Sequence, residues 1–244
     1  MNSTCKTVIN IETTGGEMPA HLWLPPGGSG PGLVMVQEIF GVSGYIERRS
    51  ADLAALGYVV LAPEVYWRLD DRDIDEHAAD ALERAMGVAS RVHWDTAVAD
   101  VRAAFLALRQ RPEVAGGAGL IGFCFGGGLA FNVAALEQPD VLVSYYGSSL
   151  PGLLGLAGDV TAPSLHHFGL ADSFIPAEQV ARIEAAVTQS PDVVFETYPG
   201  ADHAFDNPAL ASLHNPSASA TAWQKTEMFL ADRLPVRPRA AAGA

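Results

Sequence analysis

The sequence has few cysteines, few basic residues and no long apolar run. Its two cysteines, Cys5 and Cys124, argue against a disulfide framework and predict free thiols, and no pattern assigns a role to Cys5. The net charge of -13 at pH 7 repels nucleic acid. No run approaches the ~18 apolar residues of a membrane span, and the N-terminal segment lacks the features of a secretory signal. We therefore expect a cytoplasmic protein that binds neither nucleic acid nor a membrane.

Short β-branched runs alternate with longer alanine-rich segments of helical period. This alternation predicts an α/β protein with a mostly parallel sheet of about eight strands, an antiparallel first pair and helices on both faces. We expect one domain over residues 1–234 and a flexible tail over 235–244. The expected strands lie near 6–12, 20–24, 32–37, 58–62, 118–123, 141–146, 163–168 and 193–198, and the expected helices near 44–56, 76–90, 95–111, 125–137, 176–189 and 218–233.

The stretch GFCFGGG at 122–128 joins a predicted buried strand to a predicted helix. In this context the pattern glycine-x-Cys124-x-glycine is typical of a nucleophile elbow, a sharp turn that exposes its central residue at the carboxyl end of a sheet. Small residues at Gly122 and Gly126 let strand and helix approach closely, and the helix N-terminus favours a thiolate. A phosphate loop would need lysine where Gly128 stands, and a dinucleotide fingerprint belongs in the first βα turn. Taken alone, the pentapeptide leaves an inert buried cysteine equally open.

Two further residues complete the order nucleophile, acid, histidine that the α/β-hydrolase fold places along the chain. Asp172 follows one predicted strand, and His203 follows the next. His203 would accept the thiol proton, and Asp172 would orient the imidazole. Asp172 as a turn residue and Asp202 as the orienting acid stay open as alternatives. The histidines at 166–167 lie inside a predicted strand and are expected in the core.

Several motifs resemble those of the dienelactone hydrolases, also called carboxymethylenebutenolidases. These motifs are MVQEIFGV, GYVVLAPEVYWR, GFCFGGGLAF, SYYG, HHFGLAD and YPGADHAF. The resemblance covers most of the chain and implies the α/β-hydrolase fold. It also implies that Cys124, Asp172 and His203 are the catalytic triad. It further implies that Glu38 pairs with the resting thiol, which becomes a thiolate when substrate displaces it. Independently of the family, Glu38 ends a predicted strand beside the elbow, and unpaired carboxylates are seldom buried.

The resemblance assigns two kinds of binding groups around this triad. The backbone N–H groups of Ile39 and Phe125 would form an oxyanion hole, and Tyr145 would lie near the ligand. The family holds a substrate carboxylate with arginines, one of them four residues after the histidine, where this chain has Asn207. Arg84 is the candidate for a second arginine, and Asn207 is expected to provide a polar floor to the pocket. Arg68 and Arg72 are further candidates, although all three arginines can be solvated surface charges.

The resulting hypothesis is a hydrolase that cleaves a small ester or lactone through a thiol acyl-enzyme. We expect no metal and no organic cofactor, since no H-E-x-x-H motif is present. The partner is a small-molecule substrate, and the expected assembly is a monomer or a weak homodimer. Two alternatives remain: a broader carboxylesterase that acts on neutral substrates, and a non-catalytic small-molecule-binding protein of the same fold.

Overall fold

The computed structural model describes residues 5–237, in which eight strands form one sheet in the order β1-β2-β4-β3-β5-β6-β7-β8. β2 runs antiparallel to β1 and to β4, and the remaining neighbours are parallel. The predicted fold class and the antiparallel first pair are therefore confirmed. The strands are β1 (Cys5–Thr13), β2 (Gly16–Leu24), β3 (Gly30–Val36), β4 (Val59–Pro63), β5 (Val114–Phe123), β6 (Leu142–Tyr145), β7 (Ser164–Gly169) and β8 (Val193–Tyr198).

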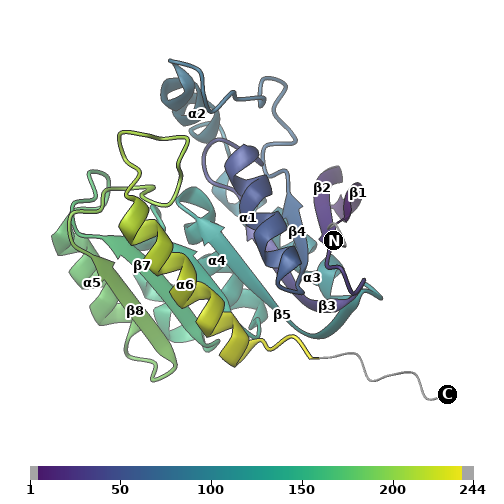
Figure 1. Cartoon of the computed structure of the whole chain (residues 1–244). Coiled ribbons are helices and arrows are strands. Elements are labelled where there is room, and N and C mark those ends of the chain that lie inside the picture. Colours follow the sequence, from purple (N-terminus) through teal and green to yellow (C-terminus); the bar gives the residue numbers. More distant parts are fainter. Residues whose placement is uncertain (1–4, 238–244) are drawn as a thin grey trace.

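Helices cover both faces of this sheet (Figure 1). α1 and α6 lie in front of it in this view, α3, α4 and α5 lie on the other side, and α2 stands apart at the top. This burial of both faces explains the continuous apolar runs of β3 and β4, in which every residue is buried. The helices are α1 (Gly44–Ala55), α2 (Ala81–Ala89), α3 (Trp94–Arg109), α4 (Phe125–Glu137), α5 (Ala177–Val187) and α6 (Pro216–Arg233).

The observed elements differ from the predicted ones mainly at their ends. The helix expected over 76–90 begins only at Ala81, because the side chain of Asp75 accepts a hydrogen bond from the His77 N–H and turns the chain (3.0 Å). β2 begins at Gly16 rather than near residue 20, since it continues the tight hairpin with β1. Two short 3-10 helices, Leu150–Gly152 and Leu154–Asp159, were not predicted.

The chain ends bear on two of the expectations. Residues 238–244 of the expected flexible tail lie outside the described residues, and 235–237 form no helix or strand. Within residues 5–237, no helix combines the length and apolar character needed to cross a bilayer. The single domain over 1–234 and the cytoplasmic location stay predictions.

The topology brings four loops to one edge of the sheet. β3, β5, β7 and β8 are parallel, so their carboxyl ends meet at the same edge. Glu38 follows β3, Cys124 follows β5, Asp172 follows β7 and His203 follows β8. Residues up to 165 positions apart in the chain therefore gather at one edge, as the order of the motifs predicted.

Candidate active site

Cys124 occupies the sharp turn between β5 and α4, with the unusual backbone angles φ 52° and ψ -115°. A positive φ is uncommon for a residue with a side chain, and such strain is found where the surroundings impose it. Both flanking glycines are required by close packing. A Cβ atom at Gly122 would lie 2.2 Å from the carbonyl oxygen of Gly126, and one at Gly126 would lie 2.3 Å from that of Val36. The turn thus has the geometry of a nucleophile elbow.

The imidazole of His203 lies between Cys124 and Asp172. Its Nε2 atom is 3.1 Å from Cys124 Sγ, and its Nδ1 atom is 2.8 Å from Asp172 Oδ2. All three side chains are buried. The other carboxylate oxygen of Asp172 accepts hydrogen bonds from the backbone N–H groups of Phe174 (2.8 Å) and Ile175 (2.7 Å), which fix its orientation. A thiol, an imidazole and a carboxylate are thus aligned for transfer of a proton.

Burial and charge act in opposite directions on the pKa values of this pair. Burial by itself raises the pKa of Cys124, but the charge and hydrogen bond of His203 hold it below its ordinary value of 9.0. Burial likewise disfavours the charged form of His203, yet Cys124 and Asp172 raise the pKa of the imidazole well above 6.5. Cys124 is also the N-cap of α4, where the helix dipole favours a negative charge. The site therefore favours a thiolate beside an imidazolium.

Asp202, the alternative orienting acid, has a different role in the structure. Its Oδ1 atom accepts hydrogen bonds from the backbone N–H groups of Ser173 (2.7 Å) and His203 (2.6 Å). It thereby joins the loop after β7 to the loop after β8. The side chain that reaches the imidazole is that of Asp172, so the geometry favours Asp172 over Asp202.

Glu38 is almost fully buried and bonded to Asn207. The amide nitrogen of Asn207 donates to Glu38 Oε1 at 2.6 Å, and the amide oxygen of Asn207 accepts from the Ala209 N–H at 2.9 Å. Burial, followed by the negative charge of Cys124, raises the pKa of Glu38 well above 4.5. The structure therefore pairs Cys124 with His203 and Glu38 with Asn207, whereas the family resemblance pairs the resting thiol with Glu38.

The two backbone groups expected in an oxyanion hole flank the elbow. Phe125 is the first residue of α4, so its N–H has no acceptor within the helix. Ile39 lies in the loop after β3, and its carbonyl oxygen accepts a hydrogen bond from the hydroxyl of Tyr66 (3.1 Å). The rings of Tyr66 and Phe125 are 6.1 Å apart, so the tyrosine connects the loop to the start of the helix.

Tyr145 is not at the mouth of the site. It is fully buried, its hydroxyl is 2.7 Å from Thr226 Oγ1, and its ring stacks on Phe123. Its side chain lies buried at the end of β6, and its carbonyl oxygen accepts a hydrogen bond from the Cys124 N–H (2.9 Å). The expectation that Tyr145 lies near the substrate stays a prediction. The next residue, Tyr146, has its ring 5.2 Å from that of His203. The side chains of these two adjacent tyrosines point in different directions because the backbone of Tyr146 has a φ of 37°.

The histidines expected in the core are confirmed there. His167 lies within hydrogen-bonding distance of Tyr198 Oη (2.9 Å) and Thr226 Oγ1 (3.0 Å). Burial lowers the pKa of His166 to about 4, so this imidazole is neutral in the folded protein.

A cavity of about 490 Å³ adjoins the loop that carries Glu38. Gln37 and Phe40 line it, and so do Arg72 and Arg84. Arg84 is exposed, and among residues 5–237 its side chain donates only to the backbone oxygen of Asp73 (3.2 Å), whereas Arg72 is partly neutralised by Glu64 (3.6 Å). Arg84 is therefore the better placed of the two for an anionic ligand.

Arg68, the other arginine candidate, is engaged elsewhere. It forms an ion pair with the buried Asp100 and stacks over the ring of Trp67 (4.1 Å). Among residues 5–237, no group of three or more histidine, cysteine, aspartate or glutamate side chains is arranged to hold a metal ion.

Two residues beside the triad were not singled out from the sequence. The half-exposed ring of Phe174 lies 5.0 Å from that of His203 and forms an apolar wall on the solvent side. Ser148 lies against Cys124, where its side-chain hydrogen bond lowers the pKa of the thiol and its N–H donates to the Cys124 carbonyl oxygen (3.1 Å). Phe174 could have been noticed as an aromatic residue two positions after the acid, but serine after SYYG carries no comparable signal.

Comparison with known proteins identifies the family of this chain. A sequence model described as the dienelactone hydrolase family matches residues 18–234. The chain belongs to the dienelactone hydrolase family. A carboxymethylenebutenolidase of a Pseudomonas species is 36% identical over 225 residues, which cover 91% of this chain and 93% of that protein. A carboxymethylenebutenolidase of Pseudomonas putida is 32% identical and covers 94% of this chain and 98% of its own length.

Solved structures of the family have the same fold. A Klebsiella pneumoniae protein assigned as a dienelactone hydrolase superposes with a TM-score of 0.80 at 27% identity, covering 94% of this chain and 99% of that chain. A dienelactone hydrolase-like promiscuous phosphotriesterase from metagenomic libraries gives a TM-score of 0.77 at 25% identity, covering 93% and 98% of the two chains. The predicted family and the prediction of a dienelactone hydrolase-like hydrolase are thereby confirmed.

Proposed function

We propose that Cys124, His203 and Asp172 form a catalytic triad that hydrolyses a small ester or lactone through a thioester intermediate. The observation that carries this proposal is the position of the His203 imidazole, which is 3.1 Å from the thiol sulfur and 2.8 Å from the Asp172 carboxylate. The lowered pKa of Cys124 supports it, because the thiolate is the attacking species.

In the first half of the reaction, the Cys124 thiolate attacks the carbonyl carbon of the substrate. The carbonyl π electrons move to oxygen, and the N–H groups of Ile39 and Phe125 stabilise the resulting oxyanion. When the tetrahedral intermediate collapses, the bond to the leaving oxygen breaks and the His203 imidazolium gives its proton to that oxygen. The products are a thioester and an alcohol, and in a lactone the alcohol stays tethered to the acyl group.

In the second half, water attacks the thioester carbonyl carbon while the neutral His203 imidazole accepts a proton from the water. Collapse breaks the carbon–sulfur bond, releases the carboxylic acid and restores the thiolate–imidazolium pair. Asp172 holds the imidazole with Nε2 facing the reaction throughout, because its own orientation is set by two backbone N–H groups.

We assign Glu38 the role of a neutral acid beside the thiolate. Burial raises its pKa and favours the protonated carboxyl group, which leaves the negative charge of the site on Cys124. The observed pairing of Cys124 with His203 supports a site that already holds the thiolate before substrate enters.

The class of substrate has two candidates. Arg84 lines the adjoining cavity and favours a lactone that carries a carboxylate, as in the relatives named carboxymethylenebutenolidase. Against this, Asn207 is neutral and already bonded to Glu38, and Phe174 presents an apolar wall, which favour an uncharged ester. To decide between these two substrate classes, KM is measured for a dienelactone and for an uncharged aryl ester, in wild type and in Arg84→Ala. An anionic substrate requires a large rise in KM in Arg84→Ala, whereas a neutral one leaves KM unchanged.

The test of the mechanism is steady-state hydrolysis by Cys124→Ala and Cys124→Ser, with Cys5→Ala as the matched control. Cys5 is the other free cysteine and is exposed, so its replacement leaves turnover unchanged. Loss of the nucleophile is expected to lower kcat by about 10³-fold or more. Turnover that survives in Cys124→Ala would place the nucleophile elsewhere. If wild type cleaves no substrate and its thiol reacts slowly with an alkylating reagent, the non-catalytic binding protein is the better account.

A further inference from the structure

The turn that carries His203 belongs to a loop without regular structure, between β8 and α6. The residue after the histidine, Ala204, has a φ of 54°, which costs energy for a residue with a Cβ atom. Such a turn needs outside support to hold the imidazole within hydrogen-bonding reach of Cys124. Within the triad, His203 is held only through its ring, by Asp172 and Cys124, and Asp202 accepts a hydrogen bond from its backbone N–H. Further groups must hold the rest of the turn.

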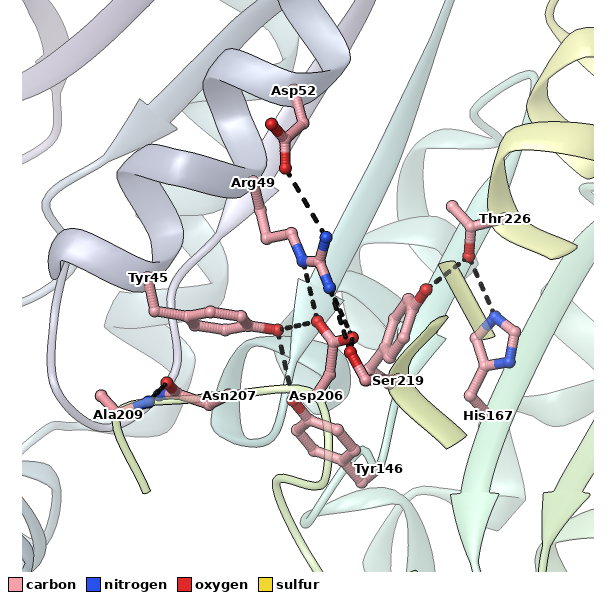
Figure 2. A network of polar contacts seen from close by, with 11 residues as sticks. Tyr45, Arg49, Asp52, Tyr146, His167, Asp206, Asn207, Ala209, Ser219 and Thr226 are labelled. Carbon is pink, nitrogen blue, oxygen red and sulfur yellow. Dashed lines mark hydrogen bonds and ion pairs between the residues drawn. The ribbon is translucent and has the colours of Figure 1, made fainter. Parts of the chain in front are cut away.

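Asp206, three residues after the histidine, ties this turn to two helices (Figure 2). Its carboxylate is fully buried and accepts two hydrogen bonds from the guanidinium of Arg49 on α1, at 2.8 and 2.6 Å. Tyr45 of α1 and Ser219 of α6 donate one hydroxyl hydrogen bond each, both at 2.6 Å. The guanidinium of Arg49 also stacks on the ring of Trp223, 3.9 Å from its centroid. Four hydrogen bonds thus occupy both carboxylate oxygens.

The same cluster reaches the imidazole from a second direction. The Tyr45 hydroxyl lies 3.4 Å from the hydroxyl of Tyr146 (Figure 2). The ring of Tyr146 packs 5.2 Å from the ring of His203. One side chain on α1 therefore contacts both the anchor of the turn and the residue that supports the imidazole. Asn207, the residue after Asp206, is hydrogen-bonded to Glu38, so the segment that Asp206 anchors also positions this acid.

We propose that the cluster of Asp206, Arg49 and Tyr45 is a positioning device that holds His203 against the Cys124 thiol. This inference rests on the proposed function, because positioning matters only if the pair is catalytic. A misplacement of about 1 Å in a catalytic group can reduce the rate by about 100-fold. The bidentate geometry of Arg49 suits this task, since two parallel hydrogen bonds fix the carboxylate in a plane as well as in distance.

The test uses the ionisation of the thiol, which needs no substrate. The absorbance of the thiolate at ~240 nm is measured as a function of pH in wild type, Asp206→Asn and Tyr45→Phe. The same measurement on Cys124→Ala gives the background absorbance. Loss of the anchor is expected to move the apparent pKa of Cys124 upward, toward that of an isolated thiol. With a substrate that wild type turns over, kcat is expected to fall by about 10- to 100-fold in Asp206→Asn while KM changes by less than about 3-fold.

The matched control is Asp100→Asn. Asp100 is also a buried carboxylate that holds an arginine, Arg68, which also stacks on a tryptophan, but it lies on α3 and not on the His203 turn. Its loss is expected to lower stability while leaving the thiol titration and kcat at wild-type values. If Asp100→Asn and Asp206→Asn shift the thiol pKa and lower kcat equally, the cluster only stabilises the fold and the proposal is overturned.

Two outcomes separate this proposal from the triad itself. If wild type shows a Cys124-dependent thiolate signal at neutral pH and Asp206→Asn titrates identically, only the positioning role is overturned. If wild type shows no such signal, the thiolate–imidazolium pair is absent and both proposals are wrong. Should Asp206→Asn fail to fold, Tyr45→Phe and Ser219→Ala decide the question, since each removes one hydroxyl from the same carboxylate and leaves the ion pair in place.

Discussion

The side-chain amide of Asn207 donates a hydrogen bond to the carboxyl group of Glu38 at 2.6 Å, and both residues are buried. The two lie 169 positions apart, Glu38 in the loop after β3 and Asn207 in the loop after β8. The hydrogen bond from the amide holds the carboxyl group in place and by itself lowers the pKa of Glu38. Burial and the negative charge of Cys124 outweigh this effect, so the pKa of Glu38 is raised and the protonated form is favoured.

Replacement of Asn207 by alanine is predicted to destabilise the protein. It leaves Glu38 Oε1 buried without its donor, a loss that costs about 1–3 kcal/mol in the free energy of unfolding. The measurement is urea unfolding at pH 7. Asn10→Ala is the control, because the amide of Asn10 also bonds to a glutamate, Glu17, but on the exposed surface (3.3 Å). The control is expected to change stability by less than about 0.5 kcal/mol. If the two substitutions lower the free energy of unfolding equally, the buried hydrogen bond stabilises the fold no more than the exposed one.

The raised pKa of Glu38 predicts a specific pH dependence of stability. Above pH 4.5 the unfolded chain releases the Glu38 proton, whereas the folded protein keeps it until the pH reaches the higher folded pKa. Between these two values, the stability of wild type falls as pH rises. Glu38→Gln retains an oxygen for Asn207 but cannot ionise, so it lacks this fall.

The comparison is therefore made by urea unfolding of wild type and Glu38→Gln at pH 4 and pH 8. The stability of the variant relative to wild type is expected to increase by about 1.4 kcal/mol for each unit by which the folded pKa exceeds the unfolded one. Ionisable groups that do not interact with Glu38 cancel in the difference, whereas Cys124, Glu76 and His203 interact with it and contribute to the measured change. A relative stability that stays constant with pH would show that Glu38 ionises normally in the folded protein.

Turnover is predicted to be greatest from neutral to alkaline pH. The thiolate is required, and the pKa of Cys124 lies below its ordinary value of 9.0, so kcat/KM rises with pH and levels off below pH 9. The imidazolium is also required, and the pKa of His203 lies above its ordinary value, so activity falls again only at a pH well above 6.5. His203→Gln removes the positive charge and is expected to return the thiol pKa toward 9.

The measurement is the titration of thiol reactivity toward iodoacetamide, read together with kcat/KM. His93→Gln is the control, since His93 is exposed at the start of α3 and its replacement leaves both profiles unchanged. A thiol pKa that does not respond to His203→Gln would mean that the helix dipole and the hydrogen bond from Ser148, rather than the histidine, keep the thiol ionised.

The fold and the close approach of Cys124, Asp172 and His203 were predictable because each depends on signals that are local in the sequence. Buried strands appear as apolar runs, and a cysteine between glycines at the junction of a strand and a helix indicates the elbow. Asp172 and His203 could be placed because parallel strands bring their carboxyl ends to one edge. The choice between Asp172 and Asp202 needed coordinates, since only the path of the backbone decides which carboxylate reaches the imidazole.

The contacts of Asp206 and Asn207 could not be predicted, because their partners Arg49 and Glu38 lie more than 150 positions away. Nothing in the local pattern HAFDN distinguishes a buried, fully bonded aspartate from a turn residue. The sequence likewise could not show that the ring of Tyr146, rather than that of Tyr145, packs against His203. Two adjacent tyrosines end the same strand, and the positive φ of Tyr146 decides which of them faces His203.

The elbow itself is predicted to tolerate no side chain at Gly126. An added Cβ would lie 2.3 and 2.4 Å from the carbonyl oxygens of Val36 and Gln37, which belong to the backbone and cannot rotate away. Gly126→Ala must therefore push α4 away from the end of β3, which displaces both Cys124 and the Phe125 N–H. We expect a loss of about 1–3 kcal/mol in the free energy of unfolding, as in other overpacked sites.

Gly87→Ala is the opposite case and the control. Gly87 lies in the exposed α2, and no atom lies within 4 Å of the position its Cβ would take. Alanine there is expected to stabilise the helix by about 0.5–1 kcal/mol, because glycine loses more backbone entropy on folding. Thermal and urea unfolding compare both variants with wild type, and alkylation of Cys124 is followed in each. Wild-type stability and thiol reactivity in Gly126→Ala would contradict the close contact between strand and helix on which the strained conformation of Cys124 depends.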